Sequence, residues 1–282
     1  FLRKSILGTI KQNVHDYQIR PIDALSLMIQ QMPQEKDPEL AQFLGRSIRE
    51  YITYLQPDMQ NQWYKQAHAQ SQKWLEKTNP SKDIQKAYYN LWKVSAKSKN
   101  ELLDLAAMLD KSRFKNLVID QEMRWQILTH LSAHAYDKTF NLLMKEKEKD
   151  PSDVGIKSAK TVQAAWYDAA NKQTLWDNFV NAIGDTIPDL RASMQGFLWL
   201  NQADLLSPYR EKFYTSILNV FETKEQSYSR SFFSNLFPNL CLEEDLKASR
   251  DFLDQTYIKP ELKQLFLEAH EELERCVKLR KL

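Results

Sequence analysis

Histidine spacing is the first pattern in this sequence that could indicate metal chemistry, because the chain has only five histidines. His130 and His134 are four residues apart, which places both imidazoles on one face of a helix. In a zinc protease helix a glutamate that acts as general base follows the first histidine, in the order H-E-x-x-H. Leu131 takes that position here. We therefore interpret the pair as partly exposed structural histidines, and we expect no metal ligand and no cofactor in this chain.

The remaining candidates for nucleophilic or metal chemistry are weaker. His270-Glu271 is followed at the second ligand position by Glu274, and we interpret this segment as the solvated face of a terminal helix. The two cysteines, Cys241 and Cys276, cannot form a disulfide framework, and we expect small buried hydrophobic side chains. This cysteine content predicts a reducing compartment and a cytoplasmic location. A G-x-S-x-G turn is also absent from the sequence. We therefore predict no catalytic residue.

One charged pair has a spacing that could serve structure or binding. Asp120 and Arg124 are four residues apart, the distance of an intrahelical charge pair, and Trp125 follows the arginine. The spacing favours a structural role, in which a carboxylate at a helix start holds the arginine at a helix contact. The alternative is an arginine that points into a cavity and binds a carboxylate. Elsewhere acidic residues alternate with lysines, as in residues 145–149, which predicts a solvated helical face.

Composition excludes several classes of function. The 282 residues include 39 basic and 37 acidic side chains, and the resulting net charge of +2 argues against nucleic-acid binding. Only five residues are glycine, which disfavours phosphate-binding loops, dinucleotide-binding folds and β-rich folds. No apolar run approaches the roughly 20 residues that span a bilayer, so we expect no membrane partner.

Helical periodicity dominates the elements that must position these residues. We expect an all-α fold, a superhelical array of antiparallel helix pairs of the HEAT or armadillo type, because short loops join the helices and the pairs recur every 30–35 residues or so. The chain is predicted to be a single domain over residues 1–282, with a division into subgroups 1–111 and 119–282 as the alternative. The expected helices span 2–14, 21–32, 38–55, 57–78, 82–97, 99–111, 119–135, 138–149, 151–170, 172–183, 188–199, 208–221, 224–236, 242–255 and 260–280.

Several of these helices carry a start signal. Asp37-Pro38 combines a capping carboxylate with a proline in the first turn, where the missing N–H costs nothing. Asp150-Pro151 and Ser207-Pro208 repeat this signal, and Thr223 with Gln226 has the spacing of a capping box. We therefore expect helices to begin at these positions.

The run from Ile119 to Leu131, I-D-Q-E-M-R-W-Q-I-L-x-x-L, resembles the C-terminal helical domain of the M1 zinc aminopeptidases, most closely the bacterial aminopeptidase N type. Further similarities follow in the expected order. These are Asp150-Pro151 with Gly155, Lys172 with Trp176, Gly196-Phe197, Gln202 with Leu205-Leu206 and Pro208-Tyr209, and Phe213-Tyr214.

The resemblance implies a function that this chain alone does not complete. The family's zinc helix H-E-x-x-H and its G-x-M-E-N strand are absent, so the zinc and the catalytic residues would belong to a preceding domain of a longer polypeptide, an interpretation that also fits a start at Phe1. This chain would form the wall or lid of the substrate chamber in an enzyme that removes N-terminal residues from peptides. Its implied partners are that catalytic domain and peptide substrates. The resemblance makes Arg124, Arg191 and Asp120 candidates to face the chamber, although a structural salt bridge is the favoured role of both arginines. The alternative is a non-enzymatic helical-repeat scaffold for protein partners.

Overall fold

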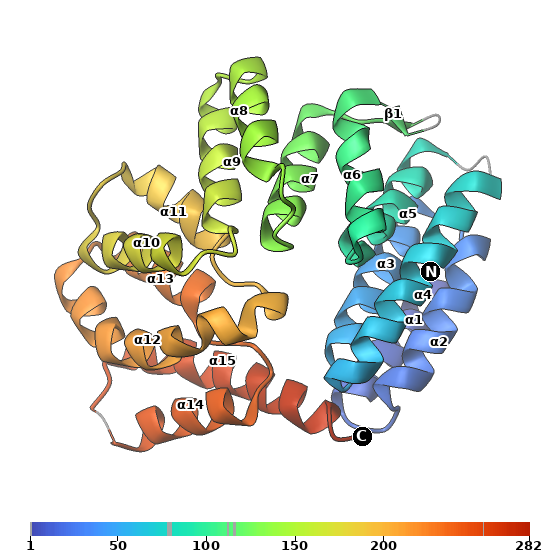
Figure 1. Cartoon of the computed structure of the whole chain (residues 1–282). Coiled ribbons are helices and arrows are strands. Elements are labelled where there is room, and N and C mark those ends of the chain that lie inside the picture. Colours follow the sequence, from blue (N-terminus) through green and yellow to red (C-terminus); the bar gives the residue numbers. More distant parts are fainter. Residues whose placement is uncertain (1, 78–80, 112, 115–116, 256) are drawn as a thin grey trace. The chain divides into compact units, whose positions relative to one another are not determined.

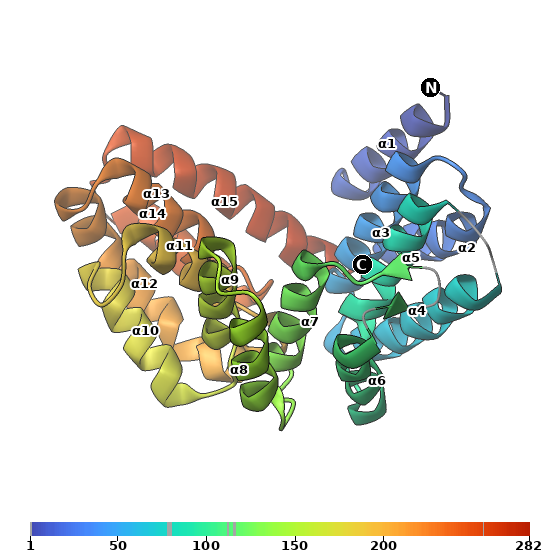
Figure 2. The ribbon, with the colours of Figure 1, turned by 90° about the horizontal axis from the view of Figure 1, so that it is seen from above.

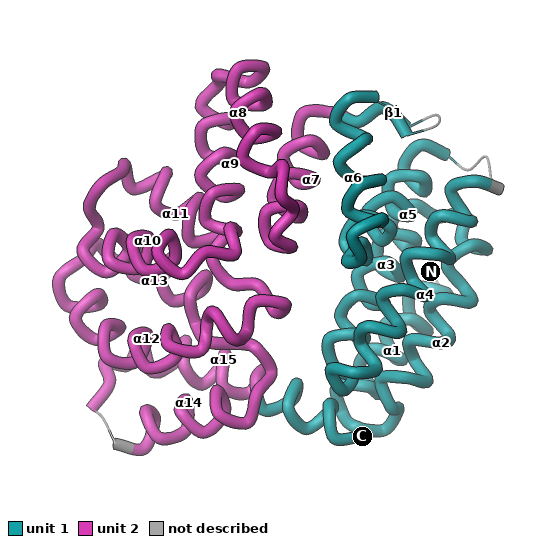
Figure 3. The backbone as a smooth tube through the Cα atoms, viewed as in Figure 1, with its two compact units in different colours: residues 1–119, 274–282 teal, residues 120–273 magenta. Residues whose placement is uncertain are grey.

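The computed structural model describes residues 2–77, 81–111, 113–114, 117–255 and 257–282, and it divides the chain into two compact units (Figures 1 and 3). Unit 1 comprises Phe1–Ile119 and Glu274–Leu282, and unit 2 comprises Asp120–Leu273. The described residues form fifteen α-helices, two short 3-10 helices and one two-stranded sheet. The all-α class built from packed helix pairs is therefore confirmed. The superhelical curvature of the array stays a prediction.

Unit 1 is built around α3 and α5, which are packed against one another. α2 and α4 also pack on this pair, and its core includes the fully buried aromatic residues Tyr51, Tyr88, Tyr89 and Trp92. The bounds of its elements are α1 (Leu2–His15), α2 (Pro21–Gln31), η1 (Met32–Gln34), α3 (Pro38–Thr53), α4 (Pro57–Lys77), α5 (Lys82–Ser95), α6 (Lys99–Lys111), β1 (Arg113–Phe114) and β2 (Leu117–Val118). The two strands pair antiparallel, with Arg113 opposite Val118 and Phe114 opposite Leu117.

Unit 2 repeats a simple packing rule. α9 packs against α7 and α11, and α11 packs in turn against α13, whereas α12 packs against α10 and α14. Helices two apart in the chain are therefore neighbours in each of two layers, as stacked helix pairs require. The bounds are α7 (Gln121–Ala133), α8 (Thr139–Lys149), α9 (Asp153–Ala164), α10 (Ala169–Asn181), α11 (Ile187–Gln195), η2 (Leu200–Gln202), α12 (Ala203–Thr223), α13 (Gln226–Leu236) and α14 (Glu243–Gln255). The last helix, α15 (Pro260–Leu279), belongs to this unit as far as Leu273 and to unit 1 from Glu274 onward.

Two glycines allow close approach around α9. A Cβ on Gly196, at the end of α11, would collide with the carbonyl oxygen of Thr161 on α9. A Cβ on Gly155 would collide with the backbone oxygen of Asp150. The Thr161 hydroxyl also donates to the carbonyl oxygen of Ala192 across the same helix contact, at 2.9 Å. The close contact between α9 and α11 therefore requires glycine, which has no side chain, at position 196.

Of the helix starts that the sequence predicted, some are confirmed and others are wrong. Asp37 caps α3 by accepting hydrogen bonds from the N–H groups of Glu39 and Leu40, as predicted. The expected start at Asp150-Pro151 is wrong by two residues, because Ser152 is the cap and accepts from Gly155. The expected capping box of Thr223 is also wrong. Thr223 is the last residue of α12, and its hydroxyl donates back to the carbonyl oxygen of Asn219.

The expected helix start at Pro208 is wrong for a local reason. α12 begins five residues earlier, at Ala203, so that Pro208 lies inside the helix. Proline has no N–H for the carbonyl of Asp204, but the Ser207 hydroxyl donates to that oxygen at 2.9 Å. The neighbouring serine therefore satisfies the carbonyl that the proline leaves free. The predicted 151–170 helix is also too long, since α9 ends at Ala164 and Asp168 caps α10.

Candidate functional site

The charged pair of Asp120 and Arg124 lies at the start of α7. Asp120 is the N-cap, and its carboxylate accepts the N–H of Met123 at 2.8 Å. The Arg124 side chain is buried and reaches across to α8, where its Nε donates to Glu146 Oε1 at 2.6 Å and its Nη2 donates to Glu146 Oε2. This two-point ion pair favours the structural role for Arg124, because the guanidinium already holds a carboxylate of the same unit.

Glu146 was not anticipated as the partner of Arg124. The alternating charges of residues 145–149 predicted a solvated face, but the Glu146 side chain is only 2% exposed. Burial by itself would raise the pKa of this carboxyl group, but hydrogen bonds from Arg124 and Gln121 outweigh that effect and lower the pKa. A signal was present in the sequence, since Glu146 is three residues after the buried Leu143 and shares its helix face.

The same motif also joins α7 to the start of α9. The indole Nε1 of Trp125 donates to Asp150 Oδ2 at 2.7 Å, and the Ser152 hydroxyl donates to Asp150 Oδ1 at 2.5 Å. The hydrogen bond from Ser152, followed by that from Trp125, lowers the pKa of Asp150. Consecutive residues Arg124 and Trp125 therefore attach α7 to α8 and to the α8–α9 turn. Within the D-Q-E-M-R-W run, Asp120, Arg124 and Trp125 thus have structural contacts.

Arg191 has a different environment on α11. Its Nη2 donates to the Ser227 hydroxyl at 2.7 Å, and Ser227 in turn donates to Glu225 Oε1 at 2.8 Å. The direct contact of the guanidinium is thus a neutral hydroxyl rather than a carboxylate. Of the three predicted chamber residues, the structure brings Asp120 and Arg124 together on α7, and it places Arg191 on another helix.

Lys172 and Gln202, which the sequence singled out only through the family resemblance, both hold together the ends of several helices. Lys172 is fully buried, and its Nζ donates to the carbonyl oxygens of Ala164 at 2.7 Å and Phe197 at 2.5 Å. The Nε2 of Gln202 donates to the carbonyl oxygens of Ala133 and Ala165. These carbonyls lie at the C-terminal ends of α7, α9 and α11, which leave unpaired acceptors. Burial lowers the pKa of Lys172 to about 7.

The described residues do not offer a zinc site. Within that part of the chain, no group of three or more histidine, cysteine, aspartate or glutamate side chains is arranged to hold a metal ion. The rings of His130 and His134 do lie on one helix face, with centroids 4.4 Å apart, but His130 is buried rather than partly exposed. His270 Nδ1 lies 3.0 Å from the Ser249 hydroxyl.

Cys241 and Cys276 are buried, as expected, but their chemical state was not predicted. Each of them is disulfide-bonded, and the described residues include no free cysteine. The predicted burial is therefore confirmed, and the disulfide-bonded state is a finding of the structure. Separately, none of the helices that the structure describes is long and apolar enough to cross a membrane.

Comparison with known proteins agrees with the motifs in α7 to α12. A family model described as the ERAP1-like C-terminal domain matches residues 3–275. The chain is also 23% identical over 268 residues to Aminopeptidase N of Streptomyces lividans, an alignment that covers 93% of this chain and 31% of that protein. These matches confirm the resemblance to the C-terminal domain of an M1 aminopeptidase over nearly the whole chain. The chain belongs to the ERAP1-like C-terminal domain family.

Proposed function

We propose that this chain is the C-terminal domain of a zinc-dependent aminopeptidase that removes N-terminal residues from peptides. The observation that carries the proposal is the family match over residues 3–275. The alignment with Aminopeptidase N leaves most of that relative's length outside this chain, which gives room for a separate catalytic domain. In this proposal the zinc and the catalytic residues belong to that domain, and the described residues of this chain supply none.

The role proposed for this chain is to form the wall or lid of the substrate chamber. A chamber wall must be rigid, because enclosure helps catalysis by excluding water and by holding the peptide in position. The buried ion pair of Arg124 and Glu146, and the carbonyl contacts of Lys172, support this role because they rigidly join successive helices of unit 2. Peptide substrates and the catalytic domain are the partners that follow.

Arg191 is the strongest of the three candidates for contact with substrate. Its guanidinium meets the neutral Ser227 hydroxyl, whereas that of Arg124 is neutralised by Glu146, and Asp120 is engaged as a helix cap. In the parent enzyme, Arg191→Gln should raise KM for longer peptides that reach this surface and leave kcat on a single aminoacyl-p-nitroanilide unchanged. Equal kinetics for Arg191→Gln and wild type on all peptide lengths would remove Arg191 from the substrate path.

The activity of the chain itself gives the main test. The purified chain should not hydrolyse an aminoacyl-p-nitroanilide above background, whereas the full parent polypeptide should do so and should lose activity to a chelator. Chelator-sensitive hydrolysis by this chain alone would contradict the proposal. A parent gene without H-E-x-x-H upstream would favour the scaffold alternative instead.

The cytoplasmic location stays a prediction from composition. The disulfide-bonded state of Cys241 and Cys276 argues for an oxidising compartment, because disulfides persist mainly outside the reducing cytosol. Fractionation of the source cells, with detection of the parent protein, distinguishes the two locations.

A further inference from the structure

Helix α1 buries little apolar surface in unit 1. It carries five aliphatic residues, but only Leu7 and Val14 are buried, while Leu2 and Ile6 are 72% and 49% exposed. The α5 helix has the same length of 14 residues and buries nine of them. A helix of this length depends on packing of its apolar face for stability, because short helices are marginal in water. Burial therefore holds α1 much less firmly than it holds α5.

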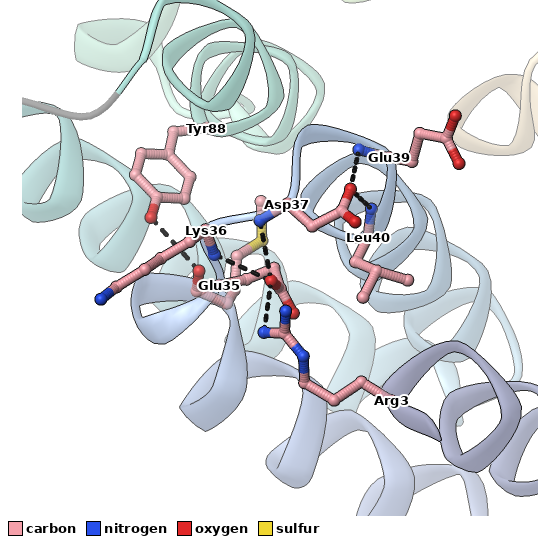
Figure 4. Close-up of polar contacts among 8 residues, drawn as sticks. Arg3, Glu35, Lys36, Asp37, Glu39, Leu40 and Tyr88 are labelled. Carbon is pink, nitrogen blue, oxygen red and sulfur yellow. Dashed lines mark hydrogen bonds and ion pairs between the residues drawn. The ribbon is translucent and has the colours of Figure 1, made fainter. Parts of the chain in front are cut away.

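Ion pairs hold the N-terminal half of α1. Arg3 Nη1 lies 2.7 Å from Glu35 Oε1, and Figure 4 shows that this oxygen also accepts the N–H groups of Lys36 and Asp37. Lys4 Nζ lies 3.6 Å from the carboxylate of Glu39, but both of those side chains are highly exposed. The contact through Glu35 is therefore the stronger of the two, since its carboxylate is buried and oriented by the backbone.

A single carboxylate holds the C-terminal half of α1. Glu50 of α3 lies 2.8 Å from Lys11 Nζ and 3.1 Å from His15 Nε2, and it also accepts the Tyr54 hydroxyl at 3.0 Å. Burial would raise the pKa of Glu50, but the hydrogen bonds led by Lys11 lower it, so the carboxylate is charged at neutral pH. All four basic residues of α1 thus face glutamates, and α1 contains no acidic residue.

We propose that α1 is an ionic strap, meaning a helix that its ion pairs hold against the rest of unit 1. The whole helix detaches while α2 to α5 stay folded. The fraction of molecules in which α1 is detached depends on ionic strength. Figure 2 shows α1 at the edge of unit 1, and the side chains of Arg3 and Lys11 are 62% and 35% exposed, so solvent ions reach these contacts. The screening length falls from about 30 Å at 0.01 M salt to about 3 Å at 1 M, which is comparable to the distances in these pairs. Screening weakens the contacts of α1 and leaves the buried core of α5 unaffected.

Hydrogen exchange followed by mass spectrometry on the intact chain tests the strap. Amides of residues 2–15 should exchange about tenfold faster in about 1 M sodium chloride than in about 0.01 M. Amides of residues 82–95, in the equally long α5, should exchange at the same rate in both. Equal salt dependence in the two helices, or none in α1, would overturn the proposal.

A matched pair of variants assigns the effect to the ion pairs. Glu50→Gln removes the carboxylate that holds Lys11 and His15, so α1 should exchange severalfold faster at low salt and respond less to added salt. Glu39→Gln changes the exposed and longer pair with Lys4, and its α1 should behave as in wild type. Wild-type exchange in Glu50→Gln would contradict the proposal. Should that variant fail to fold, the salt series on the unmodified chain still decides.

Discussion

At the scale of single residues, the buried ion pair of Arg124 and Glu146 joins α7 to α8. Their side chains are 9% and 2% exposed, so neither charge has bulk water as a substitute partner. A buried pair adds little net stability compared with apolar residues, but breaking it leaves an uncompensated charge in the interior. The main effect of the pair is therefore to specify that α7 packs against α8.

Arg124→Met should lower the free energy of unfolding by about 3–5 kcal/mol, because the Glu146 carboxylate then stays buried without its countercharge. Lys157→Gln is the control, since it removes an exposed pair with Asp153 on α9 and should cost at most about 1 kcal/mol. Urea unfolding followed by far-ultraviolet circular dichroism measures both. Adding Glu146→Leu to Arg124→Met should recover most of the loss. Similar small losses in the two single variants would show that the buried pair is not important.

The lowered pKa of Lys172 predicts that the stability of the protein depends on pH. Burial lowers its pKa to about 7 in the folded protein, whereas an unfolded chain holds this proton up to about pH 10.4. Between these values the unfolded state binds more protons, so the free energy of unfolding should rise with pH from about 7 upward. The titration of one group changes the free energy of unfolding by at most about 1.4 kcal/mol per pH unit.

Urea unfolding at several pH values between about 7 and 9 measures this slope, and Lys172→Met should reduce it. Lys97, whose pKa burial lowers to about 8, gives a contribution of the same sign that remains in the variant. An identical slope in Lys172→Met and wild type would show that the buried amine does not titrate in this range.

At the scale of elements, the close contact of α9 and α11 depends on Gly196. Its backbone is in the right-handed helical region, with φ at −91°, so alanine suits the conformation and only crowding opposes it. Gly196→Ala should destabilise the protein by about 1–3 kcal/mol through the collision with the Thr161 carbonyl.

Gly8→Ala is the matched control for this prediction. Gly8 lies inside α1, and an added Cβ would meet nothing within 4 Å. The substitution should increase the stability of α1 by about 0.5–1 kcal/mol, because alanine loses less backbone freedom in a helix than glycine. Thermal unfolding compares the two variants, and a loss at Gly8 equal to that at Gly196 would contradict the crowding account.

At the scale of the whole molecule, the redox state of the cysteines can be measured directly. The structure predicts no reactive thiol in the unfolded but unreduced protein, and two after reduction, because Cys241 and Cys276 are both disulfide-bonded. Alkylation with iodoacetamide under denaturing conditions, with and without reductant, gives the count by mass. Two alkylated thiols without reductant would instead support the reducing compartment that the composition predicts.

The family was predicted from the sequence, and the comparisons confirm it over nearly the whole chain. The proposed division of labour, with catalysis in another domain and enclosure here, also belongs to this scale. It would explain why conspicuous residues such as Arg124, Trp125 and Lys172 hold helices together instead of forming an active site.

Local patterns in the sequence were sufficient to predict the helices. The apolar stripe of α3 and its Asp37 cap depend on residues within a few positions of one another, so the sequence alone locates them. Helix starts were less accurate where a neighbouring side chain changed the outcome, as Ser207 did for Pro208.

Only the tertiary structure decided which charges are buried and what they contact. Glu146 meets Arg124 from 22 positions away, and Lys172 meets a carbonyl 25 positions away. Alternating charges and a lone lysine look solvated in a sequence, because burial depends on how helices stack and not on local spacing. The sequence by itself determined the helices and the family, and the packing between helices determined which polar residues hold them together.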